Sequence, residues 1–223
     1  ITDSFCRNSW ISNQVMQTIR DLRGELLDSL RGDGFCEHYD KSEVSPQDIH
    51  SPQLASALLF AGLYPNVARL DPPKSAGEKF PLISAGSEQL KIHPGSLCHG
   101  RLDNLHRTNH RWACFHTKMK TSQVFLRDST FLPPNALLMF GGETSFLNIH
   151  PVEKSVSIGL GAERHWHTAY ISPRSMAMIR QLRYAFEGLL RRKATDPRQP
   201  LGPSDRLVII AYIALINSVD LDG

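Results

Sequence analysis

Residues 91–127 read KIHPGSLCHGRLDNLHRTNHRWACFHTKMKTSQVFLR, and they set the expectation for the whole chain. The stretch carries seven lysines and arginines against the single acid Asp103, a formal charge of +6, whereas the complete chain carries only +3. Tryptophan, phenylalanine and histidine are interleaved with these cations. Because cations follow a phosphate backbone and flat rings stack on bases, this mixture favours single-stranded nucleic acid as a partner. The alternative is a solvated basic loop face without a ligand.

Short β-rich runs lie within this stretch and continue beyond it. They occur at 89–93, 111–117, 123–127, 136–140, 155–160 and 165–171. Several short strands at this spacing are typical of a small barrel or sandwich. Five or so strands over about 100 residues favour an OB-fold barrel, a fold whose face and loops commonly bind oligonucleotides.

Helical patterns precede the predicted barrel. Apolar residues at spacings of four, three, four and four predict an amphipathic helix within 12–31. Ser51 followed by Pro52 predicts the start of a second helix, which should stop at Gly62.

Further helical patterns follow the barrel. Ser172 and Pro173 predict a third helix, and Ser204 predicts the cap of a last apolar helix that ends near Asn217. The expected fold class is therefore α+β. We expect three units: a small helical unit at 1–70, an OB-fold barrel with a basic insertion at 71–172, and C-terminal helices at 173–223 that pack on the barrel or the helical unit.

Length and composition exclude several protein classes. A chain of 223 residues that is 41% hydrophobic can bury a core. Its longest apolar run, 207–216, is shorter than the roughly 20 residues that a membrane helix needs. The four cysteines form no Cys-x-x-Cys pair, so we expect reduced thiols in an intracellular protein. The start at Ile1 lacks a signal peptide pattern and suggests a segment of a longer protein.

Catalytic and metal-binding motifs are not found in the sequence. It contains no Gly-x-x-x-x-Gly-Lys-Ser/Thr loop, no Gly-x-Gly-x-x-Gly and no His-Glu-x-x-His. Metal-ligating side chains do crowd one region: Cys98, His99, His106, His110, Cys114 and His116. Structural zinc usually takes paired ligands two to four residues apart on both sides, and these two thiols have no such partners. We therefore assign no catalytic residue and no metal, and the residues alone indicate a binding module.

Three short motifs occur in a fixed order. Residues 58–68 read LLFAGLYPNVA, 92–97 read IHPGSL and 120–130 read KTSQVFLRDST. In this order, with helices before and after a barrel, they resemble the C-terminal region of DEAH-box and RNA helicase A-like RNA helicases, in which a helicase-associated helical domain precedes an OB-fold. The final helices are most similar to the RNA helicase A-like branch, which includes a trypanosome mitochondrial RNA-editing helicase.

The resemblance implies an RNA-binding accessory region of an ATP-dependent RNA helicase, one that contacts single-stranded RNA at the channel exit and modulates unwinding. ATP and Mg²⁺ would belong to a helicase core outside this segment, and that core and regulatory proteins would be its other partners. The family motifs imply that His93, Ser96, Lys120, Thr121 and Arg127 face RNA. The basic stretch adds Lys118, Arg101, Arg107 and Arg111.

An alternative function remains open at this point. The region could instead be a protein-interaction platform that recruits helicase cofactors, with the basic insertion at 97–109 as its docking site. The sequence leaves nucleus, cytoplasm and mitochondrion open as compartments.

Overall fold

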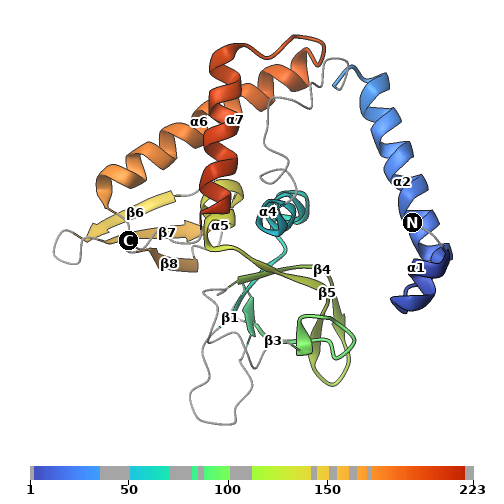
Figure 1. The fold of residues 1–223 in the computed structure, drawn as a ribbon. Coiled ribbons are helices and arrows are strands. Elements are labelled where there is room, and N and C mark those ends of the chain that lie inside the picture. The colour runs from blue at the N-terminus through green and yellow to red at the C-terminus, as the bar shows by residue number, and fades with distance from the viewer. Residues whose placement is uncertain are drawn as a thin grey trace.

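The fold combines helices with two separate sheets (Figure 1). A computed structural model describes residues 3–35, 51–70, 82–84, 88–100, 112–141, 145–150, 155–160, 165–169 and 172–218. The helices are α1 Asp3–Asn8, α2 Asn13–Gly32, α4 Pro52–Leu63, α5 Pro134–Phe140, α6 Pro173–Thr195 and α7 Pro203–Asn217. The strands are β1 Val67–Leu70, β2 Leu82–Ser84, β3 Gln89–Ile92, β4 Trp112–Lys120, β5 Val124–Leu132, β6 Ser145–His150, β7 Ser155–Leu160 and β8 His165–Ala169. The predicted α+β class is confirmed.

Serine caps begin three of the helices at the positions that the sequence predicts. The hydroxyls of Ser12, Ser51 and Ser172 accept hydrogen bonds from backbone N–H groups in the first turns of α2, α4 and α6. The predicted Ser204 cap of α7 is wrong, because Gly202 is the N-cap residue and Pro203 opens the helix. The Asp205 carboxylate accepts a 3.1 Å hydrogen bond from the Gly202 N–H, which completes this earlier start.

In the described part of the chain, five strands close a barrel in the order β1-β2-β3-β5-β4. Strand β3 runs parallel to β5, and the other neighbours, including the closing pair β1 and β4, are antiparallel. This arrangement confirms the expected OB-fold barrel.

One predicted strand is wrong, and two others are strands but do not belong to the barrel. Residues 136–140 form helix α5 rather than a strand, because a short apolar run has no decisive period and Pro134 favours a helical first turn. The strands at 155–160 and 165–169 lie outside the barrel, in a second sheet of order β6-β7-β8. Closure of β1 on β4 removes the barrel edge that these strands would need. The division into units at 1–70, 71–172 and 173–223 stays a prediction.

The first four residues of strand β4, 112–115, are buried on both faces of the strand. Ala113 and Phe115 point into the barrel, where they pack with Leu126. Trp112 and Cys114 point the other way, into a second apolar cluster between the barrel and the helices. That alternation follows from the two-residue period of a strand, so β4 joins the two cores.

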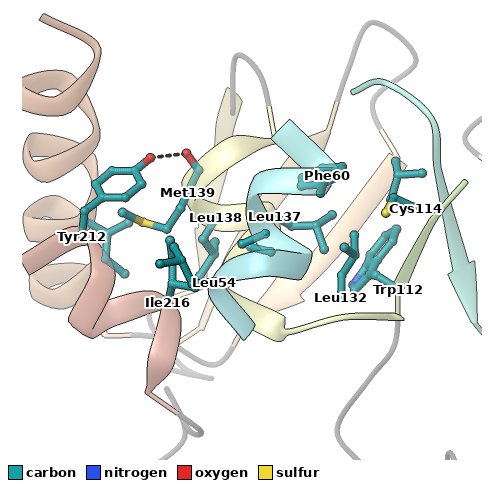
Figure 2. Close-up of a cluster of buried hydrophobic side chains, with 14 of the residues drawn as sticks. Leu54, Phe60, Trp112, Cys114, Leu132, Leu137, Leu138, Met139, Tyr212 and Ile216 are labelled. Atoms are coloured by element: carbon teal, nitrogen blue, oxygen red, sulfur yellow. Dashed lines mark hydrogen bonds between the residues drawn. The ribbon is translucent and has the colours of Figure 1, made fainter. Parts of the chain in front are cut away.

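The second cluster gathers side chains from α4, α5, α6 and α7 against the barrel (Figure 2). Tyr212 of α7 donates its hydroxyl hydrogen to the Met139 carbonyl of α5 inside this cluster. Rings of Phe186 and Tyr212 stack with their centroids 3.9 Å apart, which joins α6 to α7. Helix α4 therefore lies between the barrel and the C-terminal helices, and contributes Leu54, Ala57 and Phe60 to the cluster.

Helix α2 keeps its predicted apolar face, but the described residues do not bury that face. Its members are between 45% and 59% exposed: Val15, Ile19, Leu22, Leu26 and Leu30. In Figure 1, α1 and α2 stand to one side of the barrel and of α4. It is α4, rather than α2, that covers the barrel.

Candidate nucleic-acid interface

Six of the nine predicted RNA-binding residues lie at one end of the barrel, on β3, β4, β5 and the turns beside them. They are His93, Ser96, Lys118, Lys120, Thr121 and Arg127. The predicted residues Arg101, Arg107 and Arg111 fall outside the described part of the chain.

The turn after β3 is fixed by its own hydrogen bonds. His93 donates its backbone N–H to the Leu126 carbonyl at 2.9 Å, and its ring Nδ1 accepts the Gly95 N–H at 3.0 Å. A neutral imidazole that accepts at Nδ1 carries its hydrogen on Nε2. His93 therefore offers Nε2–H as a donor. Ser96 is engaged differently, because its hydroxyl bonds the Ser129 hydroxyl at 2.9 Å.

One surface of the barrel, which we call the outer face, collects cations and rings from three strands. In the strand register Lys91 lies opposite Phe125, Phe125 lies opposite Met119, and Thr117 lies opposite Arg127. Leu126 points into the barrel, so its neighbours Phe125 and Arg127 point outward. The His93 ring meets the Phe125 ring edge to face, with centroids 5.9 Å apart. The outer face consists of Lys91, His93, Thr117, Met119, Phe125 and Arg127.

Lys118 and Lys120 lie on the other side of the β4–β5 pair. Lys118 is opposite Leu126 and Lys120 is opposite Val124, so both share the side that leads into the barrel. The Lys118 ammonium lies 3.1 Å from the Glu88 carboxylate and 5.9 Å above the Phe115 ring. Its charge is therefore partly compensated. Thr121 lies in the turn between the strands and bonds the Gln123 carbonyl through both its N–H and its hydroxyl.

Comparisons with known proteins agree with the OB-fold barrel of this structure. Residues 55–144, which include most of α4, all five barrel strands and α5, match a family model described as oligonucleotide/oligosaccharide-binding (OB)-fold. The chain is 31% identical over 215 residues to the DExH-box ATP-dependent RNA helicase DExH1 of Arabidopsis thaliana, and the match covers 96% of this chain. The chain belongs to the family of C-terminal OB-fold regions of DEAH-box helicases.

Other relatives of this helicase region match over nearly the same length. The chain is 28% identical to the ATP-dependent DNA/RNA helicase DHX36 of Bos taurus, over 96% of this chain and 21% of that protein. It is 26% identical to the ATP-dependent RNA helicase DHX29 of Homo sapiens, over 94% of this chain and 15% of that protein. The match to DExH1 covers 20% of that protein, so the chain spans about a fifth or less of these relatives.

One backbone feature of β5 breaks the strand alternation on which the assignment of faces depends. Asp128 has φ of 52°, a left-handed conformation that asparagine and aspartate adopt more readily than most residues. It interrupts the alternation of β5, so Leu126 and Ser129 are both buried although they are three residues apart. Period-two reasoning across Asp128 therefore assigns faces wrongly.

Sequence reasoning missed four members of the outer face as site residues: Lys91, Thr117, Met119 and Phe125. Lys91 and Phe125 belong to the basic aromatic stretch, but nothing local indicates that they are neighbours. Their proximity comes from the parallel pairing of β3 with β5, which joins segments more than 30 residues apart in the sequence. The signal that could have found them is the register of an OB-fold barrel.

Three of the described side chains are buried thiols. Cys98 donates its Sγ hydrogen to the Ser129 carbonyl at 3.0 Å, and burial raises the pKa of Cys114 from 9.0 to about 11. Cys6, Cys98 and Cys114 are free cysteines in the described part of the chain. The reduced state of the thiols stays a prediction. Across the described ranges, no three His, Cys, Asp or Glu side chains are grouped so that they could hold a metal ion. The described helices include none that is both long and apolar enough to cross a membrane.

Proposed function

We propose that this OB-fold region binds single-stranded RNA as the accessory region of an ATP-dependent RNA helicase, and that the outer face is its contact surface. One observation carries the proposal: Lys91 and Arg127 are exposed cations on either side of the packed His93–Phe125 ring pair. The printed names of the relatives, which are ATP-dependent RNA or DNA/RNA helicases, support it.

Each group on the outer face has a role in this proposal. The exposed ammonium of Lys91 and guanidinium of Arg127 contact phosphates, a contribution that does not depend on base sequence. The half-buried Phe125 ring offers a surface on which a base stacks. His93 donates from Nε2 to a base edge or a ribose hydroxyl. We therefore expect an affinity that depends little on base sequence and strongly on salt concentration.

The activity of the longer protein belongs to the same proposal. ATP and Mg²⁺ are held by a helicase core elsewhere in the longer protein, because the 223 residues contain no phosphate-binding loop. The OB-fold region contacts RNA at the channel exit and modulates unwinding, together with regulatory protein partners. The four cysteines form no Cys-x-x-Cys pair in the sequence, and this pattern supports an intracellular setting for this protein.

Fluorescence anisotropy with a labelled single-stranded oligoribonucleotide tests this function. We expect binding at low salt that weakens steeply as salt is added. Arg127→Ala should lower the slope of log affinity against log salt by about 0.7, the value for one phosphate contact on a single strand. Arg23→Ala, which removes the same charge from an exposed position on α2, is the matched control and should leave the slope unchanged.

The opposite result would favour a different function. Absence of binding at low salt, or binding that is indifferent to salt, would overturn the proposal and favour the protein-interaction platform.

A further inference from the structure

The C-terminal end of α2 is closed by a glycine in a left-handed conformation. Gly34 has φ of 86° and donates its N–H to the Arg31 carbonyl at 3.0 Å. The next residue, Phe35, donates to the Leu30 carbonyl at 2.9 Å. These two bonds form a Schellman motif, which takes glycine because a Cβ would clash in this conformation. Gly34 is buried although residues 28–33 and Phe35 are exposed, so another part of the chain covers it.

The side chain that covers Gly34 is that of Arg198, in the loop between α6 and α7. A Cβ on Gly34 would lie 2.7 Å from Cγ, 3.2 Å from Nε and 3.6 Å from Cδ of Arg198. The stem of the arginine therefore lies across the end of α2, and Figure 1 shows this end beside the α6–α7 loop. Because Cγ is close to the base of its side chain, it can move away only if the side chain turns over or the loop backbone moves.

The backbone of the loop is held on both sides of Arg198. The Lys193 ammonium of α6 donates to the carbonyls of Pro197 and Gln199, the residues directly before and after the arginine. The Gln199 N–H also donates to the Asp196 carbonyl at 3.2 Å, which closes a turn around the same position. This anchoring fixes the direction in which the Arg198 stem leaves the loop.

The two helices that the loop connects are also tied to each other. Arg192 of α6 forms an ion pair with Asp205 of α7, and the Asp205 carboxylate accepts the Gly202 N–H at the start of α7. Farther along, the rings of Phe186 and Tyr212 stack between α6 and α7. The end of α2 therefore rests on a hairpin of two helices that is joined at several points.

The apolar face of α2 does not orient this helix in the described part of the chain. Its five members remain between 45% and 59% exposed: Val15, Ile19, Leu22, Leu26 and Leu30. The contact between Gly34 and Arg198 instead lies at one end of the helix, where a small change in angle moves the far end most.

We propose that Gly34 and Arg198 form a clasp that makes α2 move as one body with α6 and α7. A displacement of α2, such as one caused by a partner bound to its exposed apolar face, is transmitted through the clasp to the C-terminal helices. When the clasp is open, α2 stays helical but its direction relative to α6 varies. This conformational coupling goes beyond the proposed RNA-binding function and does not depend on it.

Double electron–electron resonance on the complete 223-residue chain tests the clasp. Spin labels are attached at the exposed positions Arg23 on α2 and Met178 on α6, through a keto-bearing amino acid that leaves the native cysteines in place. The wild type should give one narrow distance distribution. Gly34→Ala should shift and broaden it, because the added methyl group meets the Arg198 stem and a φ of 86° is unfavourable for alanine. Gly32→Ala is the matched control and should change nothing, because a Cβ there has no atom within 4 Å.

Substitutions of Arg198 test the other half of the clasp. Arg198→Ala removes the stem and should broaden the distribution, whereas Arg198→Met keeps an unbranched stem and should preserve the narrow one. Arg198 is an exposed residue, so both variants should fold, and circular dichroism and thermal melts verify this.

Three results would overturn the proposal. The first is a broad distribution in the wild type. The second is a narrow, unshifted distribution in folded Arg198→Ala. The third is an Arg198→Met distribution as broad as that of Arg198→Ala, which would show that the stem does not hold α2.

A double-substitution cycle separates the clasp from backbone strain at Gly34. Urea midpoints are measured for Gly34→Ala, for Arg198→Ala and for the two changes together. Gly34→Ala should lower the midpoint more in the wild type than in the Arg198→Ala background, because only the wild type retains the stem that the new methyl group meets. Equal losses in the two backgrounds would mean that Gly34→Ala acts through its backbone alone, and would contradict the clasp.

Discussion

The guanidinium of Arg183 on α6 donates a 3.0 Å hydrogen bond to the backbone carbonyl of Leu138 on α5. This contact is buried in an otherwise apolar interface, so it holds two helices together through a group that has no water to replace it.

Arg183→Met should therefore lower the free energy of unfolding by about 1–3 kcal/mol, because the Leu138 carbonyl loses its buried donor. Urea denaturation followed by circular dichroism measures this change. Glu187→Gln is the control: the Glu187 side chain is more than half exposed, so loss of its ion pair with the buried Arg183 should cost less than about 1 kcal/mol. Equal effects of the two substitutions would show that the ion pair, rather than the carbonyl contact, stabilises α6.

Tyr212→Phe should also destabilise the protein, by about 1–3 kcal/mol, since the Met139 carbonyl loses the buried hydroxyl that donates to it. The ring and its stacking on Phe186 remain, so the change isolates the hydrogen bond. Urea midpoints give the measurement, and Tyr184→Phe, which removes an exposed hydroxyl, should leave the midpoint in place. A Tyr212→Phe protein as stable as the wild type would contradict a stabilising role for this bond.

Alkaline pH should destabilise the protein partly through Cys114. Burial raises the pKa of Cys114 from 9.0 to about 11, so folding favours the neutral thiol. The resulting stabilisation is complete below pH 9.0, the ordinary thiol value, and is lost as the pH rises through about 11. Unfolding free energies across this window should fall less in Cys114→Ala than in the wild type. Burial raises the pKa of Tyr212 as well, so its contribution changes in the same direction and persists in the variant. Superimposable pH profiles for the two proteins would contradict the assignment to Cys114.

The two sides of the β4–β5 pair should differ in their contribution to RNA binding. Phe125→Ala should weaken binding by about 1–3 kcal/mol through lost stacking. Lys120→Ala should change affinity less than Arg127→Ala, because Lys120 lies on the side away from the ring pair. Anisotropy titrations of the three variants at one salt concentration make the comparison. A larger effect for Lys120→Ala would mean that RNA follows the inner side of β4.

The chain by itself should not hydrolyse ATP. Its sequence contains no loop that could bind phosphates, and no sequence motif that supplies Mg²⁺ ligands or a catalytic base for ATP hydrolysis. A radioactive ATP turnover assay on the purified chain checks this expectation. Turnover that a point substitution within the 223 residues abolishes would contradict the accessory-region function.

Local signals in the sequence were sufficient for most helices. Ser51 and Pro52 act within one turn of chain, so the start of α4 could be predicted from neighbouring residues alone. The secondary structure of 136–140 could not be predicted in this way, because its apolar run fits a strand or a helix equally. Packing against α4 and α7 decides between the two. Three barrel strands, β3, β4 and β5, correspond to predicted runs, whereas β1 and β2 correspond to none. The closure of β1 on β4 depends on pairing across more than 40 residues.

The sequence predicted several residues of the candidate site, but not how they are arranged on the barrel. The family motifs implied Arg127 and His93 as site residues, and the structure places both on the outer face of the barrel. Which side of the sheet the residues of β5 after Asp128 face depends on the conformation of Asp128, which no pattern of apolar residues reports. Lys118 and Arg127 lie on opposite sides of the β4–β5 pair by ordinary alternation, because Lys118 pairs with Leu126, the chain neighbour of Arg127.

The double burial of β4 has a consequence for how the molecule opens. Its first residues, 112–114, pair with both β1 and β5, and the side chains of 112–115 alternate between the barrel interior and the helical cluster. Neither core can separate from β4 without exposing apolar side chains of the other to water. The central amides of β4 should therefore exchange with deuterium only through global unfolding, more slowly than amides of α2. The barrel and its covering helices would then unfold as one cooperative unit.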